Sequence, residues 1–171
     1  MGKTKNSGTS VGTLGSPQGN FSQENLDLQI SKLSSREEML KPLIEAKVKF
    51  NPNEVLFVSR DSSGQMIWLE EGNENVGLKH IITHHSKNFY DKLGIDEKQI
   101  LFTIKDILTF GKIEYIRTRN FGKYDGYEKL IYYRSQYYFL SAIGKNGFIV
   151  SIYPKGNNEA KSLIRRYKNG K

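Results

Sequence analysis

The three histidines of this chain, His80, His84 and His85, lie within six consecutive residues. Two imidazoles held close together can act as an acid–base pair, because a neutral ring accepts a proton and a charged ring donates one near neutral pH. In RNA cleavage, one ring would take the proton of the 2′-hydroxyl and the other would protonate the leaving 5′-oxygen, without a metal ion. The alternative is structural, with His80 packed and His84 and His85 exposed on a helix.

A metal site is a second possible use of the same residues. His80 and His84 have the i, i+4 spacing of helical zinc ligands, but Ile81 stands where metalloproteases carry a glutamate base. The chain has no further histidine to complete a coordination shell and no cysteine, which also removes disulfides and thiolate chemistry. We therefore expect neither a metal nor another cofactor.

Basic and aromatic side chains interleave between residues 105 and 138, and on one face of a sheet they can hold phosphates and stack bases. Strand packing explains most of these tyrosines equally well. Lys112 is better placed than its neighbours to reach a cleft, because it starts a predicted strand just after a helix. Ser151 and Tyr153 alternate with apolar residues, so they share the polar face of the last predicted strand. Substrate contacts are expected from His84, Arg117, Arg119 and Lys123.

The elements that position these residues follow from periodicity. Residues 55–58 and 65–69 predict a β-hairpin around a turn at 61–64, and the histidine helix then extends to about residue 93. A second helix opens at Asp96 and ends at Gly111, where a left-handed cap is expected. Four antiparallel strands are expected at 113–118, 127–134, 136–143 and 147–154, the last closed by Pro154. With a short basic helix at 157–167, the pattern predicts an α+β domain, N-terminal helices packed on a twisted antiparallel sheet.

The beginning of the chain differs in composition from the rest. Residues 1–21 are poor in large apolar side chains and predict a disordered linker. Residues 22–50 predict a helical segment, either two short helices or one broken helix, with Ser35 capping the second part. The segment 51–171 is then the folded domain.

Charge and hydropathy narrow the class of partner. The 171-residue chain has 26 Lys and Arg against 18 Asp and Glu, a net charge of +8. A compact basic domain attracts polyanions, nucleic acid above all, although an anionic membrane surface or an acidic protein would also fit. No apolar run approaches the roughly 18 residues that span a bilayer, and no signal peptide is recognisable.

The order of several motifs resembles a known family. The motifs are Gly77-Leu78-Lys79-His80-Ile81, His85, Gly111-Lys112-Ile113 and a final Gly144-Lys145-Asn146-Gly147 with Ser151-x-Tyr153-Pro154. Over about residues 55–154 they resemble C-terminal toxin domains of bacterial polymorphic toxins, and more narrowly the barnase–EndoU–colicin–RelE (BECR) nuclease superfamily. The EndoU-like members imply His80 and His85 as the catalytic pair, Lys112 as the phosphorane-stabilising cation, and Ser151 with Tyr153 as positioning groups.

The resemblance also implies a biological role. It implies a BECR-fold, metal-independent endoribonuclease that leaves a 2′,3′-cyclic phosphate, often on tRNA. Such a toxin is secreted as part of a larger effector in contact-dependent growth inhibition or other interbacterial competition, and acts in the target-cell cytoplasm. Its expected partners are RNA, a cognate immunity protein with an acidic surface and, as an option, a host activator protein. The leading alternative is a non-catalytic basic RNA- or protein-binding module with structural histidines, and a phage- or capsid-related processing domain is another.

Overall fold

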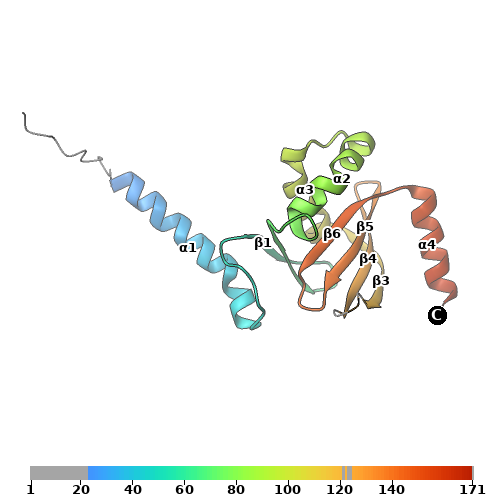
Figure 1. Ribbon diagram of the computed structural model, residues 1–171, viewed down its shortest axis with the longest axis horizontal. Coiled ribbons are helices and arrows are strands. Elements are labelled where there is room, and N and C mark those ends of the chain that lie inside the picture. Colours follow the sequence, from blue (N-terminus) through green and yellow to red (C-terminus); the bar gives the residue numbers. More distant parts are fainter. Residues whose placement is uncertain (1–22, 121, 123–124, 171) are drawn as a thin grey trace, which may run out of the picture. The chain divides into compact units, whose positions relative to one another are not determined.

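A computed structural model describes residues 23–120, 122 and 125–170, except the side chains of residues 25, 26, 29, 30 and 34 (Figure 1). The predicted linker at 1–21 and the predicted substrate contact Lys123 lie outside the described residues. The chain divides into two compact units, Met1–Ser35 and Arg36–Lys171, so the larger unit begins well before residue 51. All the site residues described below belong to this larger unit.

Helix α1 (Gln23–Glu45) is one continuous helix, not the two short or broken helices that the sequence predicted. Ser35 does not cap a new helix, because its hydroxyl donates to the carbonyl oxygen of Lys32 one turn earlier, at 3.0 Å. Leu40 and Leu43 are buried against Val55 and Trp68. The last turns of α1 therefore belong to the core of the larger unit.

A hairpin of β1 (Val55–Arg60) and β2 (Met66–Glu70) confirms the predicted strand–turn–strand pattern. Its turn is closed by Asp61, whose carboxylate accepts hydrogen bonds from the backbone N–H groups of Ser63 and Gln65, at 2.9 and 3.1 Å. Gly64 completes the turn with a φ of 83°, a conformation that glycine adopts without strain.

Four antiparallel strands form the main sheet in the order β3-β4-β5-β6. They are β3 (Lys112–Asn120), β4 (Asp125–Tyr133), β5 (Gln136–Gly144) and β6 (Ile149–Lys155). Pro154 does not close the last strand as predicted, since β6 continues to Lys155. Because β6 is an edge strand, a residue without an N–H group is tolerated there. The helices and two antiparallel sheets confirm the α+β class.

Two helices precede this sheet, α2 (Gly77–Leu93) and α3 (Glu97–Phe110), and α3 begins after Asp96 as predicted, with a capping box between Asp96 and Gln99. Gly111 ends α3 in an extended conformation, with φ −71° and ψ 143°, so the predicted left-handed cap is wrong. A Cβ at Gly111 would lie 2.3 Å from the Ile107 carbonyl oxygen and from the Ile131 side chain. Close approach of α3 to the sheet, not backbone conformation, therefore requires this glycine.

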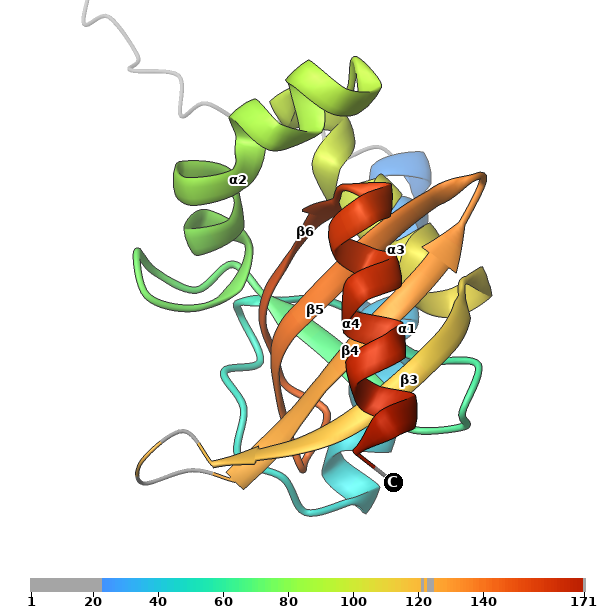
Figure 2. The ribbon, with the colours of Figure 1, turned by 90° about the vertical axis from the view of Figure 1, so that its right-hand side faces the viewer.

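The helices cover different parts of the sheet (Figures 1 and 2). Helix α3 and the hairpin share the main core with one sheet face, through buried residues such as Ile104, Ile131 and Ile152. Helix α4 (Asn157–Asn169) packs Ala160 against Tyr115 and Leu130 on the opposite face. Helix α2 lies along the edge strand β6. Among the described helices, none is long and apolar enough to cross a bilayer.

Candidate functional site

The loop between β2 and α2 sets the direction of the histidine helix. Gly77, the first residue of α2, has a φ of 80°, and a Cβ there would lie 2.8 Å from the carbonyl oxygen of Glu70. The same loop presents the Glu74 carbonyl oxygen 2.8 Å from Nδ1 of His80. A carbonyl oxygen only accepts, so Nδ1 of His80 carries the hydrogen. The loop thereby fixes the orientation of the His80 ring, so Nε2 is the ring nitrogen that can act on a substrate.

The structure brings the three imidazole rings together. Ring centroids of His80 lie 4.7 Å from His84 and 5.8 Å from His85, and those of His84 and His85 are 6.4 Å apart. His84 is exposed, whereas His80 and His85 are partly buried. The two more buried rings are the pair that the sequence predicted as acid and base.

Two residues of the neighbouring strand β6 hold His85 in place. Its Nε2 lies 3.1 Å from the hydroxyl oxygen of Ser151, a buried side chain. Its ring stacks on Tyr153 with centroids 4.5 Å apart and an interplanar angle of 28°. Ser151 and Tyr153, predicted from their alternation, therefore both contact the predicted catalytic helix.

Burial first, and then the positive charges of the neighbouring His80 and His84, together lower the pKa of His85 to about 4. His85 is therefore neutral at pH 7, the form that accepts a proton. Its buried Nδ1 has no hydrogen-bond partner among the described residues. Only the edge of the ring that faces Ser151 is thus tied to the protein by a hydrogen bond.

The register of the sheet extends this site across one face. Tyr153 pairs with Phe139, Phe139 with Leu130, and Leu130 with Tyr115, so this row crosses all four strands. Arg117 lies two residues beyond Tyr115 on β3 and pairs with Glu128 on β4, which places both on the same face as Tyr153. We call this face of the sheet the α4-side face. It carries Tyr153, Phe139, Leu130, Tyr115, Glu128 and Arg117.

A buried carboxylate on the α4-side face was not predicted. Glu128 pairs with Arg117 at 2.7 Å and with Arg119 at 3.1 Å, and only 2% of its side chain is exposed while the arginines are about half exposed. Burial raises the pKa of Tyr153, and the charges of Glu159 and Glu128 contribute to the rise, so the Glu128 carboxylate acts electrostatically on Tyr153. The predicted hairpin of 113–118 and 127–134 already implied the pairing of Arg117 with Glu128, a signal that could have found it.

The predicted phosphorane-stabilising residue lies elsewhere. Lys112 is the first residue of β3, exposed and paired with Glu114 at 3.0 Å. Strand β3 is the sheet edge opposite β6, three strand spacings or about 14 Å away. The structure does not bring Lys112 to the histidines. Lys155 instead lies on β6, with its Nζ 5.7 Å from the ring centroid of Tyr153.

The sequence also contains a signal for Lys155 that our prediction did not use. It continues the alternation of Ser151 and Tyr153, two residues beyond Tyr153 on the same strand. Its Nζ pairs with Glu159 at 3.7 Å, and it is the more buried partner of that pair. The site thus combines an imidazole pair with a hydroxyl, a phenol and a lysine.

Within the described ranges, no group of three or more His, Cys, Asp and Glu side chains is arranged to hold a metal ion. No protein-family model matches the sequence, and no curated protein matches it either.

Proposed function

We propose that this protein is an endoribonuclease that cleaves RNA by transesterification at the His80–His85 site. The 2′-oxygen of the RNA bonds to the adjacent phosphorus as the bond to the 5′-oxygen breaks. The products are a 2′,3′-cyclic phosphate and a 5′-hydroxyl end. The observation that carries the proposal is the neutral His85, held by Ser151 at 3.1 Å and facing the His80 ring at 5.8 Å.

The geometry favours a division of roles between the two histidines. His85 takes the 2′-hydroxyl proton, because its ring is neutral at pH 7 and a neutral imidazole can accept one. His80 acts in its doubly protonated form: it gives the Nε2 proton to the leaving 5′-oxygen and keeps the Nδ1 hydrogen on the Glu74 carbonyl oxygen. The proton count balances, with one proton taken and one proton given in each cleavage.

Three side chains around His85 are suited to the phosphate. The raised pKa of Tyr153 keeps its phenol protonated, and a protonated phenol donates a hydrogen bond to a phosphate oxygen. Ser151 supplies a hydroxyl beside the same ring, and Lys155 supplies the cation that Lys112 is too distant to supply. We therefore assign the phosphorane-stabilising role to Lys155 in place of Lys112.

The biological setting extends this proposal. The resemblance to polymorphic toxin domains and the net charge of +8 support a toxin that acts on tRNA in the cytoplasm of a target cell. Its producer would carry an immunity protein whose acidic surface covers the α4-side face. Growth arrest on induced expression, relieved by coexpression of the neighbouring gene product and absent for His85→Ala, is the expected result. Arrest by His85→Ala at an equal protein level would contradict the toxin role as a nuclease.

One observation favours a second candidate, a non-catalytic RNA-binding module. His85 is neutral and stacked against Tyr153, as a structural histidine would also be. In this case the basic side chains would bind RNA, and the imidazoles would only pack. The two functions differ in whether RNA is cleaved.

A single gel separates the two candidates. Total bacterial RNA is incubated in EDTA with the wild-type protein, with His85→Ala and with Lys112→Ala as a matched cation control. The nuclease proposal expects discrete fragments from wild type and from Lys112→Ala, and none from His85→Ala. Intact RNA in every lane, with RNA binding retained, would favour the binding module.

A further inference from the structure

A pocket of about 320 Å³ lies between α4 and strands β3 and β4. Tyr115, Arg117 and Glu128 line it from the sheet, and Arg166 and Tyr167 line it from α4. We call it the α4 pocket. It lies on the α4-side face, and the row from Tyr115 to Tyr153 runs from it toward the histidine site, with Leu130 and Phe139 packed against α4.

Tyr115 gives the α4 pocket an unused donor. Its side chain is 5% exposed, and its hydroxyl oxygen is buried with no hydrogen-bond partner among the described residues. Leaving such a group unpaired costs stability, so its presence is expected to serve a ligand. Burial raises the pKa of Tyr115 to about 12, so the hydroxyl keeps its proton and can donate.

The charge around this hydroxyl favours an anion. Glu128 is paired with both Arg117 and Arg119, and Arg166 adds a third guanidinium group from the last turn of α4. Three cations therefore face one carboxylate. A guanidinium group presents its N–H donors in a fork that matches two phosphate oxygens.

The aromatic wall of the pocket suits the base of the same nucleotide. Tyr167 stacks on Tyr115 with centroids 5.0 Å apart and an interplanar angle of 25°. Aromatic side chains stack bases of single-stranded RNA with little sequence preference. A phosphate donor set beside an aromatic face is the combination that binds a nucleotide.

We propose that the α4 pocket binds a nucleotide of single-stranded RNA that flanks the cleavage position. Tyr115 and Arg166 would bind its phosphate, and Tyr167 would contact its base. This inference rests on the proposed function, because its ligand is the same RNA, and it adds a second binding subsite to the histidine site. Tyr115 and Tyr153 are three strand spacings or about 14 Å apart. Helix α4 packs on Leu130 and Phe139 between them, so one RNA strand has to pass around α4 to occupy both.

The test measures binding of a labelled single-stranded RNA oligonucleotide by fluorescence anisotropy, with His85→Ala as the parent so that no cleavage occurs. Adding Tyr115→Phe removes only the hydroxyl, and adding Arg166→Gln removes one cation. Each is expected to raise Kd about tenfold, as for loss of one hydrogen bond to a charged group. Arg166→Gln should also lower the slope of log K against log salt by about 0.7.

Two control variants match these changes elsewhere in the fold. Arg165→Gln removes the same charge from the preceding residue of α4, which lines a different pocket with Asn158 and Lys161. Tyr138→Phe removes a buried tyrosine hydroxyl from the main core, beneath the opposite sheet face. Both controls should change Kd less than about twofold. Equal losses for Arg165→Gln and Arg166→Gln, or unchanged binding by Tyr115→Phe, would overturn the subsite.

Cleavage assays separate this inference from the proposed function. In the active protein, Tyr115→Phe should raise KM for the oligonucleotide and leave kcat unchanged, with no effect on a dinucleotide too short to reach the pocket. Cleavage that is unaffected by Tyr115→Phe and Arg166→Gln on both substrates would remove the subsite and keep the nuclease. RNA binding that depends on both residues in a wild-type protein without cleavage would remove the nuclease and keep the subsite.

Discussion

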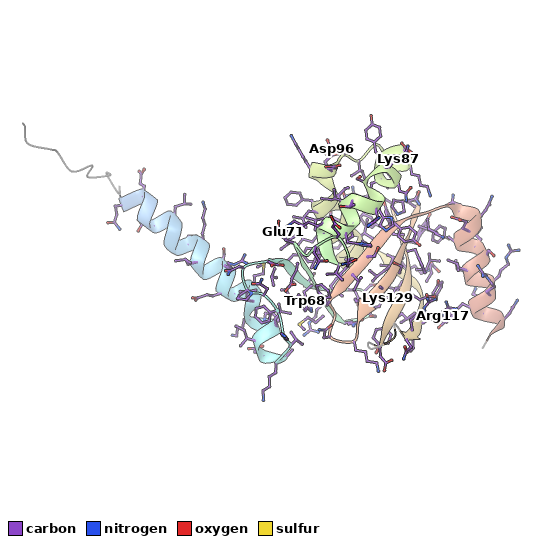
Figure 3. The ribbon with its side chains drawn as sticks, viewed as in Figure 1. Trp68, Glu71, Lys87, Asp96, Arg117 and Lys129 are labelled. Atoms are coloured by element: carbon purple, nitrogen blue, oxygen red, sulfur yellow. The ribbon has the colours of Figure 1, made fainter. Side chains whose placement is uncertain are left out.

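Glu128 and Lys129 are neighbours on β4, both buried, and as successive residues of a strand they face opposite sides of the sheet. Figure 3 labels Lys129 together with Arg117, a partner of Glu128. Lys129 lies on the core side, where its Nζ donates to Asp61 and, at 2.7 Å, to Gln65. Glu128 faces α4 and pairs with two half-exposed arginines. Burial alone therefore does not tell a structural charge from a functional one. The exposure of its partners does.

The two ion pairs connect different parts of the molecule. The Lys129–Asp61 pair has both side chains 1% exposed and ties the turn of the β1–β2 hairpin to the middle of the sheet. The Glu128 cluster keeps guanidinium groups on a face that solvent and ligands reach. We interpret the first as a fixed structural link and the second as a carboxylate that orients the cations for which we propose RNA contacts.

The largest effect is expected for Lys129→Met, which leaves the Asp61 carboxylate buried without its cation. Breaking one partner of a buried pair costs about 3–5 kcal/mol of unfolding free energy. Urea unfolding followed by the fluorescence of Trp68, the single tryptophan, measures it. The double variant Lys129→Met with Asp61→Asn should recover much of the loss, since the amide oxygen introduced at this position could still accept from the turn. A loss below about 1 kcal/mol for Lys129→Met would contradict a structural role.

A smaller effect is expected for Glu128→Gln on the other face of the same strand. Its partners, Arg117 and Arg119, are about half exposed and can be rehydrated when the charge is lost. The unfolding free energy should therefore fall by about 1–2 kcal/mol, less than for Lys129→Met in the same assay. Equal losses for the two variants would erase the distinction between the two charges.

The histidine site should make stability depend on pH. The pKa of His85 is lowered to about 4 in the folded state from 6.5 in the unfolded chain. The unfolded state thus binds more protons between these values, so stability is complete above pH 6.5 and is lost as pH falls toward 4. Because His85 is only half buried, we expect a loss of about 1 kcal/mol. Urea unfolding at pH 7 and 4.5 measures it.

His85→Phe, which keeps a ring against Tyr153, should remove this part of the pH dependence. His84→Ala, a change at an exposed neighbour, should leave most of it in place. If the two variants behave alike, the pH dependence belongs to other groups.

The smallest stability effects are expected for two lysines that differ in position. Lys112 is 74% exposed and Lys155 21% exposed, and each pairs with one glutamate. Lys112→Ala should change the unfolding free energy by less than about 0.5 kcal/mol and leave RNA cleavage unchanged. Lys155→Ala should lower kcat at least about tenfold, as expected for loss of a phosphate-stabilising cation. A greater loss of kcat in Lys112→Ala would restore the role predicted from sequence.

Part of this site could be predicted because its signals are local. The histidines are adjacent in sequence, and alternation alone placed Ser151 and Tyr153 on one strand face. The hairpin and the α2 and α3 helices likewise follow from periodicity and turn residues. In each case a few neighbouring side chains decide the conformation.

Other features depended on tertiary position. Lys112 begins a strand after a glycine as predicted, but a four-stranded meander places its first and last strands on opposite edges. Gly111 is set by contact with Ile131, which lies in a strand further along the chain. Glu128 and Lys129 are consecutive charged residues, and the sequence does not tell which one lies in the main core. Their partners in the fold, Arg117 for Glu128 and Asp61 for Lys129, show the difference.

The most direct test of the central claim is the cleavage rate of one labelled RNA in EDTA, together with the chemistry of the new ends. The nuclease proposal predicts 2′,3′-cyclic phosphate and 5′-hydroxyl ends from the wild-type protein. It predicts a rate about 10²–10⁴-fold lower for His85→Ala, the loss expected for a general base. Cleavage by His85→Ala at the wild-type rate, or ends without a cyclic phosphate, would contradict it.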